Sequence, residues 1–270
     1  MRHTRQLAIV AVSTGLAAAL SAPAQAADST VSILHAVPGA TVDVYANGDA
    51  VLEDFTPGTL ADPLTLPEGS YDLKVTAAGA GADGAAVIEA NDVAVPGGAN
   101  ITVVAHLNEG GTPVLTPFVN DTKPTEAGKA RITVRHTAAA PAVDVRANGE
   151  VAFPGLTNPK EAKADLAAGT ISADVALAGT DTVAIGPADV TLAEGTNTIV
   201  YAWGSAADDN LALKVQTITG LHSAPSGVPS GSGGQSAPNG MIPIGVAGGA
   251  AFLAGAAAFA ATRRRQDVRA

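Results

Sequence analysis

The sequence predicts an all-β protein with two tandem Ig-like or β-sandwich domains and a C-terminal transmembrane helix. Three observations support this fold class. The chain contains an internal repeat, its repeated segments alternate apolar and polar residues between glycine-bearing turns, and a long uncharged apolar segment lies near the C-terminus. Together they predict paired β-domains followed by a membrane anchor.

Residues 1–26 have the organisation of a secretory signal peptide. Arg2 and Arg5 precede the apolar run "LAIVAVSTGLAAAL", and "SAPAQA" then places small residues at Ala24 and Ala26. This order is typical of a segment removed on export, here after Ala26. An N-terminal membrane anchor is the alternative, but the apolar run is short for a span of roughly 20 residues.

The internal repeat defines two domains. The phrase "TVDVYANG" begins at Thr41 and returns as "AVDVRANG" at Ala142, and "LPEGSYDLKVT" returns in the same way as "LAAGTISADVA". Self-similarity over such a distance indicates two copies of one structural unit. The copies predict domains at residues 29–122 and 128–220, each within the size range that folds alone.

The pattern inside each copy is that of short strands. Apolar and polar side chains alternate in "NITVVAHL", and Asn47-Gly48 and Asn148-Gly149 each follow a Val-Asp-Val strand. Asn-Gly is the strongest short hairpin signal, because a type I′ turn needs positive φ at both central residues. We expect a loop between strands at 77–84, and a loop that enters a strand at 158–169.

The C-terminal part predicts a tethered, single-pass membrane protein. Residues 221–240 form a Ser/Gly/Pro linker, and residues 241–262 are uncharged and are followed at once by three arginines. That length can span a bilayer, and the basic tail 263–270 should stay cytoplasmic by the positive-inside rule. We therefore expect a protein of the cell membrane whose β-domains are extracytoplasmic.

Charge and cysteine content exclude several function classes. The whole chain has a net charge of −10, but six arginines and only one acid lie in the terminal segments, which leaves 9 basic and 24 acidic side chains and a net charge of about −15. Such a surface repels nucleic acid. The chain has no cysteine, so disulfides, thiol catalysis and cysteine metal sites are excluded.

Two histidines and two aspartates recur at equivalent positions and are the candidate functional residues. His35 and His136 end apolar strand faces, where histidine can act as a ligand or base or can bond a neighbouring loop. Asp43 and Asp144 could bond backbone amides or pair with the histidines. A His–Asp pair without a nucleophile is not a catalytic triad, so no catalytic residue is assigned.

The remaining candidates carry weaker signals. The histidines are scattered without a metal-ligand motif, and the acidic turn at 207–210 lacks the twelve-residue calcium pattern. Tyr201 and Trp203 share a strand face, from which aromatic rings can stack on sugars or fill a core. No metal, cofactor or cofactor-binding residue is assigned.

In each copy, the segment from the repeated histidine to the Asn-Gly turn resembles the first part of the DUF4397 domain. It reads "HAVPGATVDVYANG" in the first copy and "HTAAAPAVDVRANG" in the second, where Pro141 is displaced and Arg146 replaces Tyr45. The resemblance covers residues 31–219. It implies a β-sandwich surface module, a domain of unknown function often found in tandem in bacterial surface proteins, and it implies no catalytic residues. The Ala/Gly/Val-rich, lysine-poor composition is similar to that of high-GC actinobacteria.

These observations favour a non-catalytic binding or structural module of the cell envelope. The expected partners are the membrane, through residues 241–262, and an envelope protein or glycan. One alternative is an exported hydrolase with an unrecognised His/Asp-containing site. Another is that the second domain only spaces the first one outward from the membrane.

Overall fold

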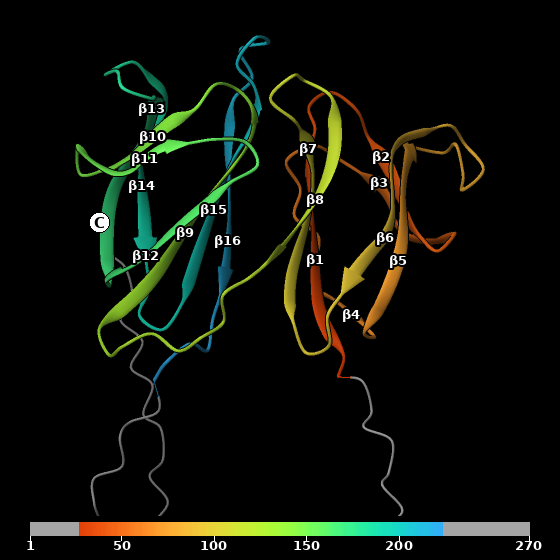
Figure 1. Ribbon diagram of the computed structural model, residues 1–270, viewed down its shortest axis with the longest axis horizontal. Helices are drawn as coiled ribbons and strands as arrows, with labels where there is room; N and C mark the ends of the chain where they lie inside the picture. Colours follow the sequence, from red (N-terminus) through yellow and green to blue (C-terminus); the bar gives the residue numbers. More distant parts are fainter. Residues whose placement is uncertain (1–26, 224–270) are drawn as a thin grey trace, which may run out of the picture. The chain divides into compact units, whose positions relative to one another are not determined.

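A computed structural model describes residues 27–223, and this part of the chain is all β (Figure 1). Its sixteen strands form four sheets of four strands each, which build two β-sandwiches, and it contains no helix. The all-β, two-sandwich prediction is therefore confirmed. The predicted signal peptide 1–26, transmembrane helix 241–262, tail 263–270 and nearly all of the linker 221–240 lie outside the described residues. Within residues 27–223 no helix could cross a membrane.

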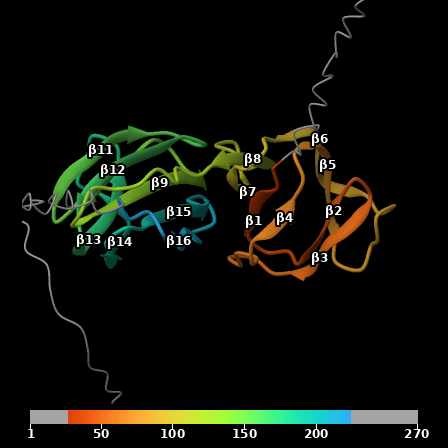
Figure 2. The same ribbon diagram turned by 90° about the horizontal axis from the view of Figure 1, so that it is seen from below.

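The first sandwich consists of strands β1–β8, and Figure 2 shows its two sheets as separate layers. The strands are β1 (Ser29–Ala36), β2 (Val42–Ala46), β3 (Asp49–Phe55), β4 (Leu64–Leu66), β5 (Gly69–Ala77), β6 (Ala86–Val95), β7 (Asn100–Leu107) and β8 (Pro113–Val119). The order β4-β1-β7-β8 forms the first inner sheet, and the order β3-β2-β5-β6 forms the first outer sheet. The glycine-rich segment predicted as a loop at 77–84 connects β5 to β6.

The second sandwich repeats this topology. Its strands are β9 (Lys129–Ala139), β10 (Val143–Ala147), β11 (Glu150–Leu156), β12 (Glu161–Ala167), β13 (Gly169–Leu177), β14 (Val183–Leu192), β15 (Asn197–Ser205) and β16 (Ala212–Ile218). The second inner sheet has the order β12-β9-β15-β16, and the second outer sheet has the order β11-β10-β13-β14. Each strand thus occupies the position of its counterpart in the first sandwich.

The two predicted Asn-Gly hairpins are confirmed. Asn47 and Gly48 connect β2 to β3 with φ of 52° and 88°, and Asn148 and Gly149 connect β10 to β11 with φ of 52° and 85°. Positive φ at both central residues is the type I′ geometry that matches the twist of paired strands. Each Asn side chain also accepts a backbone N–H bond from the neighbouring strand, at 2.8 Å from Asp72 in the first copy.

The segment 158–169 contains more strand than its sequence predicted. Residues Glu161–Ala167 form β12, which pairs antiparallel with β9 along its whole length. Its exposed charged side chains alternate with half-buried apolar ones. The sequence did not predict this strand in full because alanine fits a helix or a loop equally well. Pairing with β9 stabilises the strand conformation.

The central strands of both inner sheets are buried on two faces. β1 pairs in parallel with β7, and β9 pairs in parallel with β15, and these four strands are buried along nearly their whole length. Strands in parallel pairs are typically covered on both faces. One face of each inner sheet covers its own outer sheet, and the other face contacts the inner sheet of the other domain.

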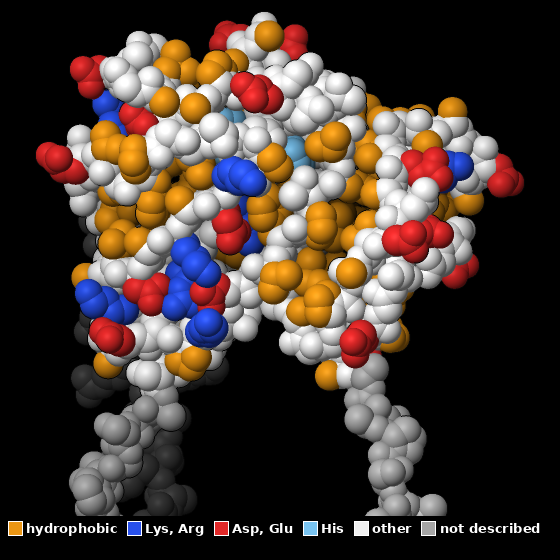
Figure 3. Space-filling model, in the orientation of Figure 1, with side chains coloured by type: hydrophobic (Ala, Val, Ile, Leu, Met, Phe, Trp, Pro, Cys, Tyr) orange, Lys and Arg blue, Asp and Glu red, His pale blue; other side chains and the backbone are white. Residues whose placement is uncertain are grey.

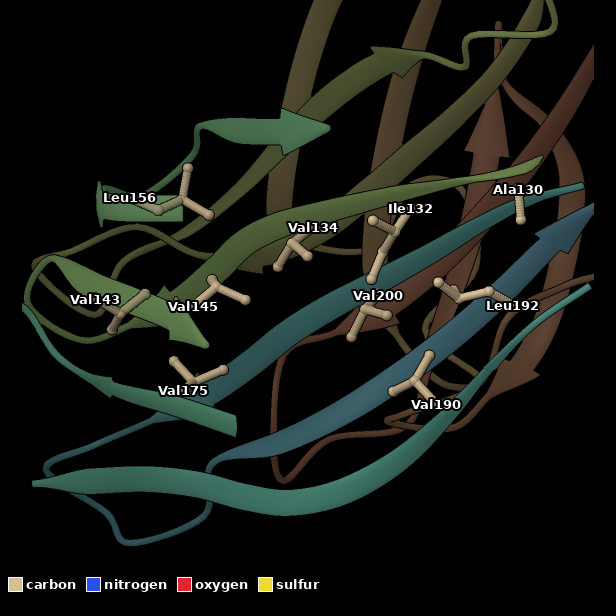
Figure 4. Close-up of a cluster of buried hydrophobic side chains, with 10 residues drawn as sticks. All are labelled: Ala130, Ile132, Val134, Val143, Val145, Leu156, Val175, Val190, Leu192 and Val200. Carbon is tan, nitrogen blue, oxygen red and sulfur yellow. The ribbon is translucent and has the colours of Figure 1, made fainter. Parts of the chain in front are cut away.

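Each sandwich has its own hydrophobic core between its two sheets. Figure 4 shows the core of the second domain, in which Val134 of β9 and Val200 of β15 lie across from Val145 of β10 and Val175 of β13. The first domain has equivalent clusters around Ile33 and Val103. Fully burying an aliphatic side chain contributes roughly 1.5–3 kcal/mol, so both cores contribute to the stability of the described residues.

A third apolar cluster joins the two domains. It is formed by residues of both inner sheets, namely Leu34, Ala36, Val104, Phe118, Ile199 and Tyr201. A polar bridge lies beside it: the Gln216 side chain accepts a hydrogen bond from Thr102 at 2.9 Å and donates one to Ser32 at 3.3 Å. Gln216 belongs to β16, whereas Thr102 and Ser32 belong to the first domain. Residues 27–223 are therefore one compact unit.

Candidate functional site

The two repeated histidines bond the loop that follows their own strand. Nε2 of His35 lies 2.8 Å from the carbonyl oxygen of Ala40, and Nε2 of His136 lies 3.0 Å from that of Pro141. A carbonyl oxygen only accepts hydrogen bonds, so Nε2 carries the proton in both rings. Nδ1 receives a long 3.4 Å bond from the backbone N–H two residues further on. Both nitrogens of each ring are thus engaged by the backbone.

Burial keeps both histidines uncharged. It lowers the pKa of His35 below its usual value, and the bond to the Ala40 carbonyl only partly opposes this shift. The pKa of His136 is likewise lowered by burial, against the bond to Pro141 and the nearby charge of Glu109. A neutral imidazole whose lone pair already accepts a backbone bond is a poor general base.

The two repeated aspartates each hold two backbone amides. The Asp43 carboxylate accepts bonds from the N–H groups of Asp54 at 2.9 Å and Gly79 at 2.8 Å. Asp54 has a φ of 52° and lies where the β2–β3 register shifts, and Gly79 lies in the β5–β6 turn. The carboxylate therefore connects an irregular edge strand to a turn across the outer sheet.

The second copy reproduces this clamp. Asp144 accepts bonds from Gly155 at 2.7 Å and from Gly179 at 2.8 Å. These two backbone bonds lower the pKa of Asp144, and the charge of Arg146 adds to the effect. No ion pair forms between a histidine and an aspartate among the described residues. The repeated motif therefore has a structural role: its histidine bonds the carbonyl of one loop, and its aspartate bonds the backbone amides of an edge strand and a turn.

The aromatic candidates of β15 lie in the interdomain cluster. Tyr201 is fully buried; its hydroxyl donates to the Gln216 side chain at 2.6 Å and accepts from Arg135 at 2.7 Å. Trp203 packs partly buried against the same cluster. The first-domain counterpart of Trp203, His106, bonds Thr116 on β8 and is also buried. Tyr201 and His106 are therefore not accessible to a sugar, whereas Trp203 keeps part of its surface exposed.

The acidic turn near 207–210 is held by its own residues. The Asn210 side chain accepts the N–H of Ser205 at 2.7 Å, and Asp209 adopts a φ of 52°. Within residues 27–223 there is no group of three or more His, Cys, Asp or Glu side chains that could hold a metal ion.

An apolar cavity lies inside the second sandwich, and sequence reasoning did not identify it. Its volume is about 270 Å³, all eight strands of the domain contribute to its lining, and it reaches the surface at the exposed Ala152 of β11. Val134, Val200 and Ile171 are among the side chains that line it. Apolar side chains in orange are visible on the surface of this domain, beside a cluster of charged ones (Figure 3).

Two charged residues lie at the rim of this cavity, but their side chains point away from its interior, because Arg146 and Asp174 alternate with the core-facing Val145 and Val175 on paired strands. Arg146 of β10 pairs with Asp174 of β13 at 2.6 Å and with the exposed Asp181 at 3.6 Å. The hydrogen bond to Asp174 raises the pKa of Arg146, so the guanidinium stays charged. Comparing the two copies position by position would have shown the smaller side chains that open the cavity.

Sequence reasoning also missed two buried arginines of β9. Arg131 forms a bidentate pair with Asp165 at 2.8 and 2.9 Å and a further ion pair with Asp121 at 3.0 Å. Arg135 is 1% exposed and lies over the Phe118 ring of the first domain. Both alternate with the core-facing Ile132 and Val134 positions. The pattern predicts that they point away from their own core but not that another domain covers them.

A comparison with protein families finds a match, which covers part of the chain. Residues 29–146 match the model of DUF4397, a domain of unknown function. The match includes all strands of the first sandwich and continues through β9 into β10. The resemblance found in the sequence is confirmed over this range, and its extension through the rest of the second copy remains a prediction. None of the curated proteins matches the chain.

Proposed function

We propose that this chain, whose residues 29–146 carry a DUF4397 domain, is a membrane-anchored extracytoplasmic protein that serves as a non-catalytic binding or structural module of the cell envelope. The proposal includes a signal peptide at 1–26 and a transmembrane helix at 241–262. It also includes an Ig-like relationship of both sandwiches and a DUF4397 origin of the second copy.

The use of the recurring histidines and aspartates as backbone supports carries the non-catalytic part of the proposal. In both domains the ring nitrogens bond a loop and the carboxylate oxygens bond two amides. A catalytic base needs a free lone pair within reach of substrate. The repeated histidines and aspartates make the same backbone bonds in both domains, so a structural role explains them better than a catalytic one.

The contact between the inner sheets supports a role as one connected unit. The interdomain cluster and the Gln216 bridge join the two domains directly. Deleting the second domain to test whether it is only a spacer would uncover Leu34, Val104 and Phe118, which would themselves cause nonspecific binding. Substitutions on the exposed faces of the outer sheets are therefore the better test of the spacer alternative.

Cosedimentation of purified residues 27–224 with envelope fragments of the producing cell tests the proposed role. We expect saturable binding that unlabelled protein competes away, with an unrelated protein of similar negative charge as the control. Loss of binding after the fragments are stripped of protein would identify a protein partner, and retention would identify a wall glycan. Absence of saturable binding to both preparations would contradict a binding role.

The membrane topology has a separate test. Protease added to intact cells or protoplasts should remove the β-domains and leave a small fragment that an antibody against residues 263–270 detects. The arginine cluster that follows the apolar segment is the reason to expect this orientation. Digestion of the tail from outside would contradict it.

An exported hydrolase with a His/Asp-containing site is the alternative function. It predicts turnover of envelope esters, amides or glycans that is lost in His35→Gln and His136→Gln proteins while their amide NMR spectra stay native. The non-catalytic proposal predicts that these variants lose stability and that neither they nor the parent protein shows turnover.

A further inference from the structure

The two homologous sandwiches differ in how well their interiors are filled. The cavity of the second domain is about 270 Å³, whereas the equivalent interior space of the first domain is about 40 Å³. Both spaces are lined by the same strands in the same order, and therefore side chains rather than topology cause the difference.

Four substitutions between the copies account for it. In the second domain, smaller residues replace the larger ones at equivalent strand positions that line both spaces: Leu64 becomes Ala164, Tyr71 becomes Ile171, Leu73 becomes Ala173, and Val51 becomes Ala152. Protein interiors are normally packed to the density of organic crystals. Two positions change in the opposite direction, Leu52 to Phe153 and Val31 to Ile132, and the space remains although both larger side chains line it.

We propose that the second domain binds a small hydrocarbon ligand, a ring system or a short alkyl chain with an uncharged end, inside this cavity. The walls are almost wholly aliphatic, with Val134, Ile171 and Val200 among them. Apolar cavities accept apolar molecules, and this space is roughly twice the ~150 Å³ of an engineered cavity that binds benzene. Binding restores the dispersion contacts that the empty walls lack.

The charges at the rim select against an anionic end group. Arg146 is paired with Asp174 and Asp181, and Asp144 lies close enough to add to its electrostatic surroundings. One positive and three negative side chains leave this region net negative, on a domain surface that is itself acidic. A carboxylate would be repelled there, and inside the apolar walls it would lose its hydration without gaining a partner, which costs much more for a charged group than for a hydroxyl.

Methyl NMR of residues 27–224 tests this proposal, because this part of the chain contains both cores and the sixteen strands that the structure describes. Naphthalene, decanol and decanoate are titrated into the ¹³C-methyl-labelled protein at pH 7. We expect saturable shifts of the Val134, Val175 and Val200 methyls with naphthalene and decanol, and at least tenfold weaker binding of decanoate. The first-domain methyls serve as the internal control and should not shift.

Exchanging the side chains between copies provides matched variants. The double variant Ala164→Leu, Ala173→Leu gives the second domain the first domain's residues and should abolish binding without loss of folding. The reciprocal variant Leu64→Ala, Leu73→Ala should create binding in the first domain. The proposal is overturned if the parent protein shows no saturable methyl shifts up to the solubility of naphthalene, or if the filled variant binds as the parent does. Tighter binding of decanoate than decanol would overturn the assignment of an uncharged end.

Discussion

The guanidinium carbon of Arg135 lies 4.4 Å from the centre of the Phe118 ring, so a buried cation of the second domain stacks on an aromatic ring of the first. Its Nε also donates to Glu161 at 2.9 Å, and one terminal nitrogen donates to the Tyr201 hydroxyl. Burial raises the pKa of Tyr201, so the phenol stays protonated and can pass a hydrogen bond on to Gln216. A planar guanidinium suits this position, because it stacks and donates in its plane at once.

Replacing Arg135 should therefore weaken the whole described unit. We expect Arg135→Ala to lower the free energy of unfolding by about 3 kcal/mol, because it removes a buried side chain together with its stacking and hydrogen bonds. Urea denaturation measures this change. Lys163→Ala is the control: its side chain is 48% exposed in the ion pair with Asp121, and it should cost less than about 1 kcal/mol. Equal losses in the two variants would contradict a special role for Arg135.

The buried histidines should make the fold sensitive to mild acid. Burial lowers the pKa of His35, His136 and His106 in the folded protein, whereas the unfolded chain has a pKa of about 6.5 for each. The unfolded chain therefore binds more protons below that pH, so stability is fully present above about pH 6.5 and is lost as the pH falls.

Urea unfolding at pH 7.5 and 5.5 measures this sensitivity. Each histidine contributes a slope of up to about 1.4 kcal/mol per pH unit, and His35→Asn should remove one histidine's share. The lowered pKa of Asp144 affects stability in a lower pH range. Its contribution to the free energy of unfolding is lost only as the pH falls below about 4. A free energy of unfolding that stays constant from pH 7.5 to 5.5 would contradict buried neutral histidines.

Removing an aspartate clamp should destabilise its domain. Asp43→Ala leaves the amides of Asp54 and Gly79 without their acceptor, and we expect a loss of about 2 kcal/mol. Asp144→Ala should act in the same direction in the second domain. The exposed Asp49 is the control position, and Asp49→Ala should have little effect. Amide hydrogen exchange gives the local readout, with the fastest new exchange expected at Gly79.

Gly58 should tolerate a side chain poorly because of Trp203. Gly58 has a φ of +74°, and an added Cβ would lie 3.0 Å from the Trp203 ring. Gly111 has a similar φ of +83° with nothing within 4 Å of that position. Alanine at either site should cost about 1 kcal/mol through backbone strain, but only Gly58→Ala should shift the emission of the single tryptophan. An equal shift in both variants would contradict the contact.

Opposite stability changes should follow from exchanging core residues between the copies. Leu73→Ala should destabilise the first domain by about 2 kcal/mol, the lower end of the range for core leucines, because Leu73 is only partly buried. Ala173→Leu fills existing space and should stabilise the second domain by about 1 kcal/mol. Thermal unfolding of each variant measures the change. Destabilisation by Ala173→Leu would show that the second interior has no room for the added side chain.

Much of the fold could be predicted from the sequence because its signals are local. The Asn47-Gly48 turn needs positive φ, and alternating strands such as "NITVVAHL" have a period that fits only a pleated strand. The internal repeat then predicts the same topology for both domains. β12 was predicted only in part, since an alternation built on alanine is too weak to separate a strand from a loop.

The contacts between layers could not be predicted in this way. Alternation shows that Thr102 and Arg135 point away from their own core, but it does not show whether water or protein covers them. The bond from Thr102 to Gln216 joins residues 114 positions apart, and Arg135 of the second domain lies over the Phe118 ring of the first. The second-domain cavity depends on a few methyl groups at separate positions, such as Ala164 and Ala173, each of which is an ordinary strand residue taken alone.

The two-sided burial of the inner sheets also makes each sandwich dependent on the other. A recombination event that removed one copy would leave the other with Leu34, Val104 and Phe118 exposed, or with Ile199 and Tyr201 exposed. Such surfaces promote self-association, and residues 27–124 alone should elute as aggregates in size-exclusion chromatography. The two sandwiches therefore depend on each other, because each covers an apolar face that the other would expose alone.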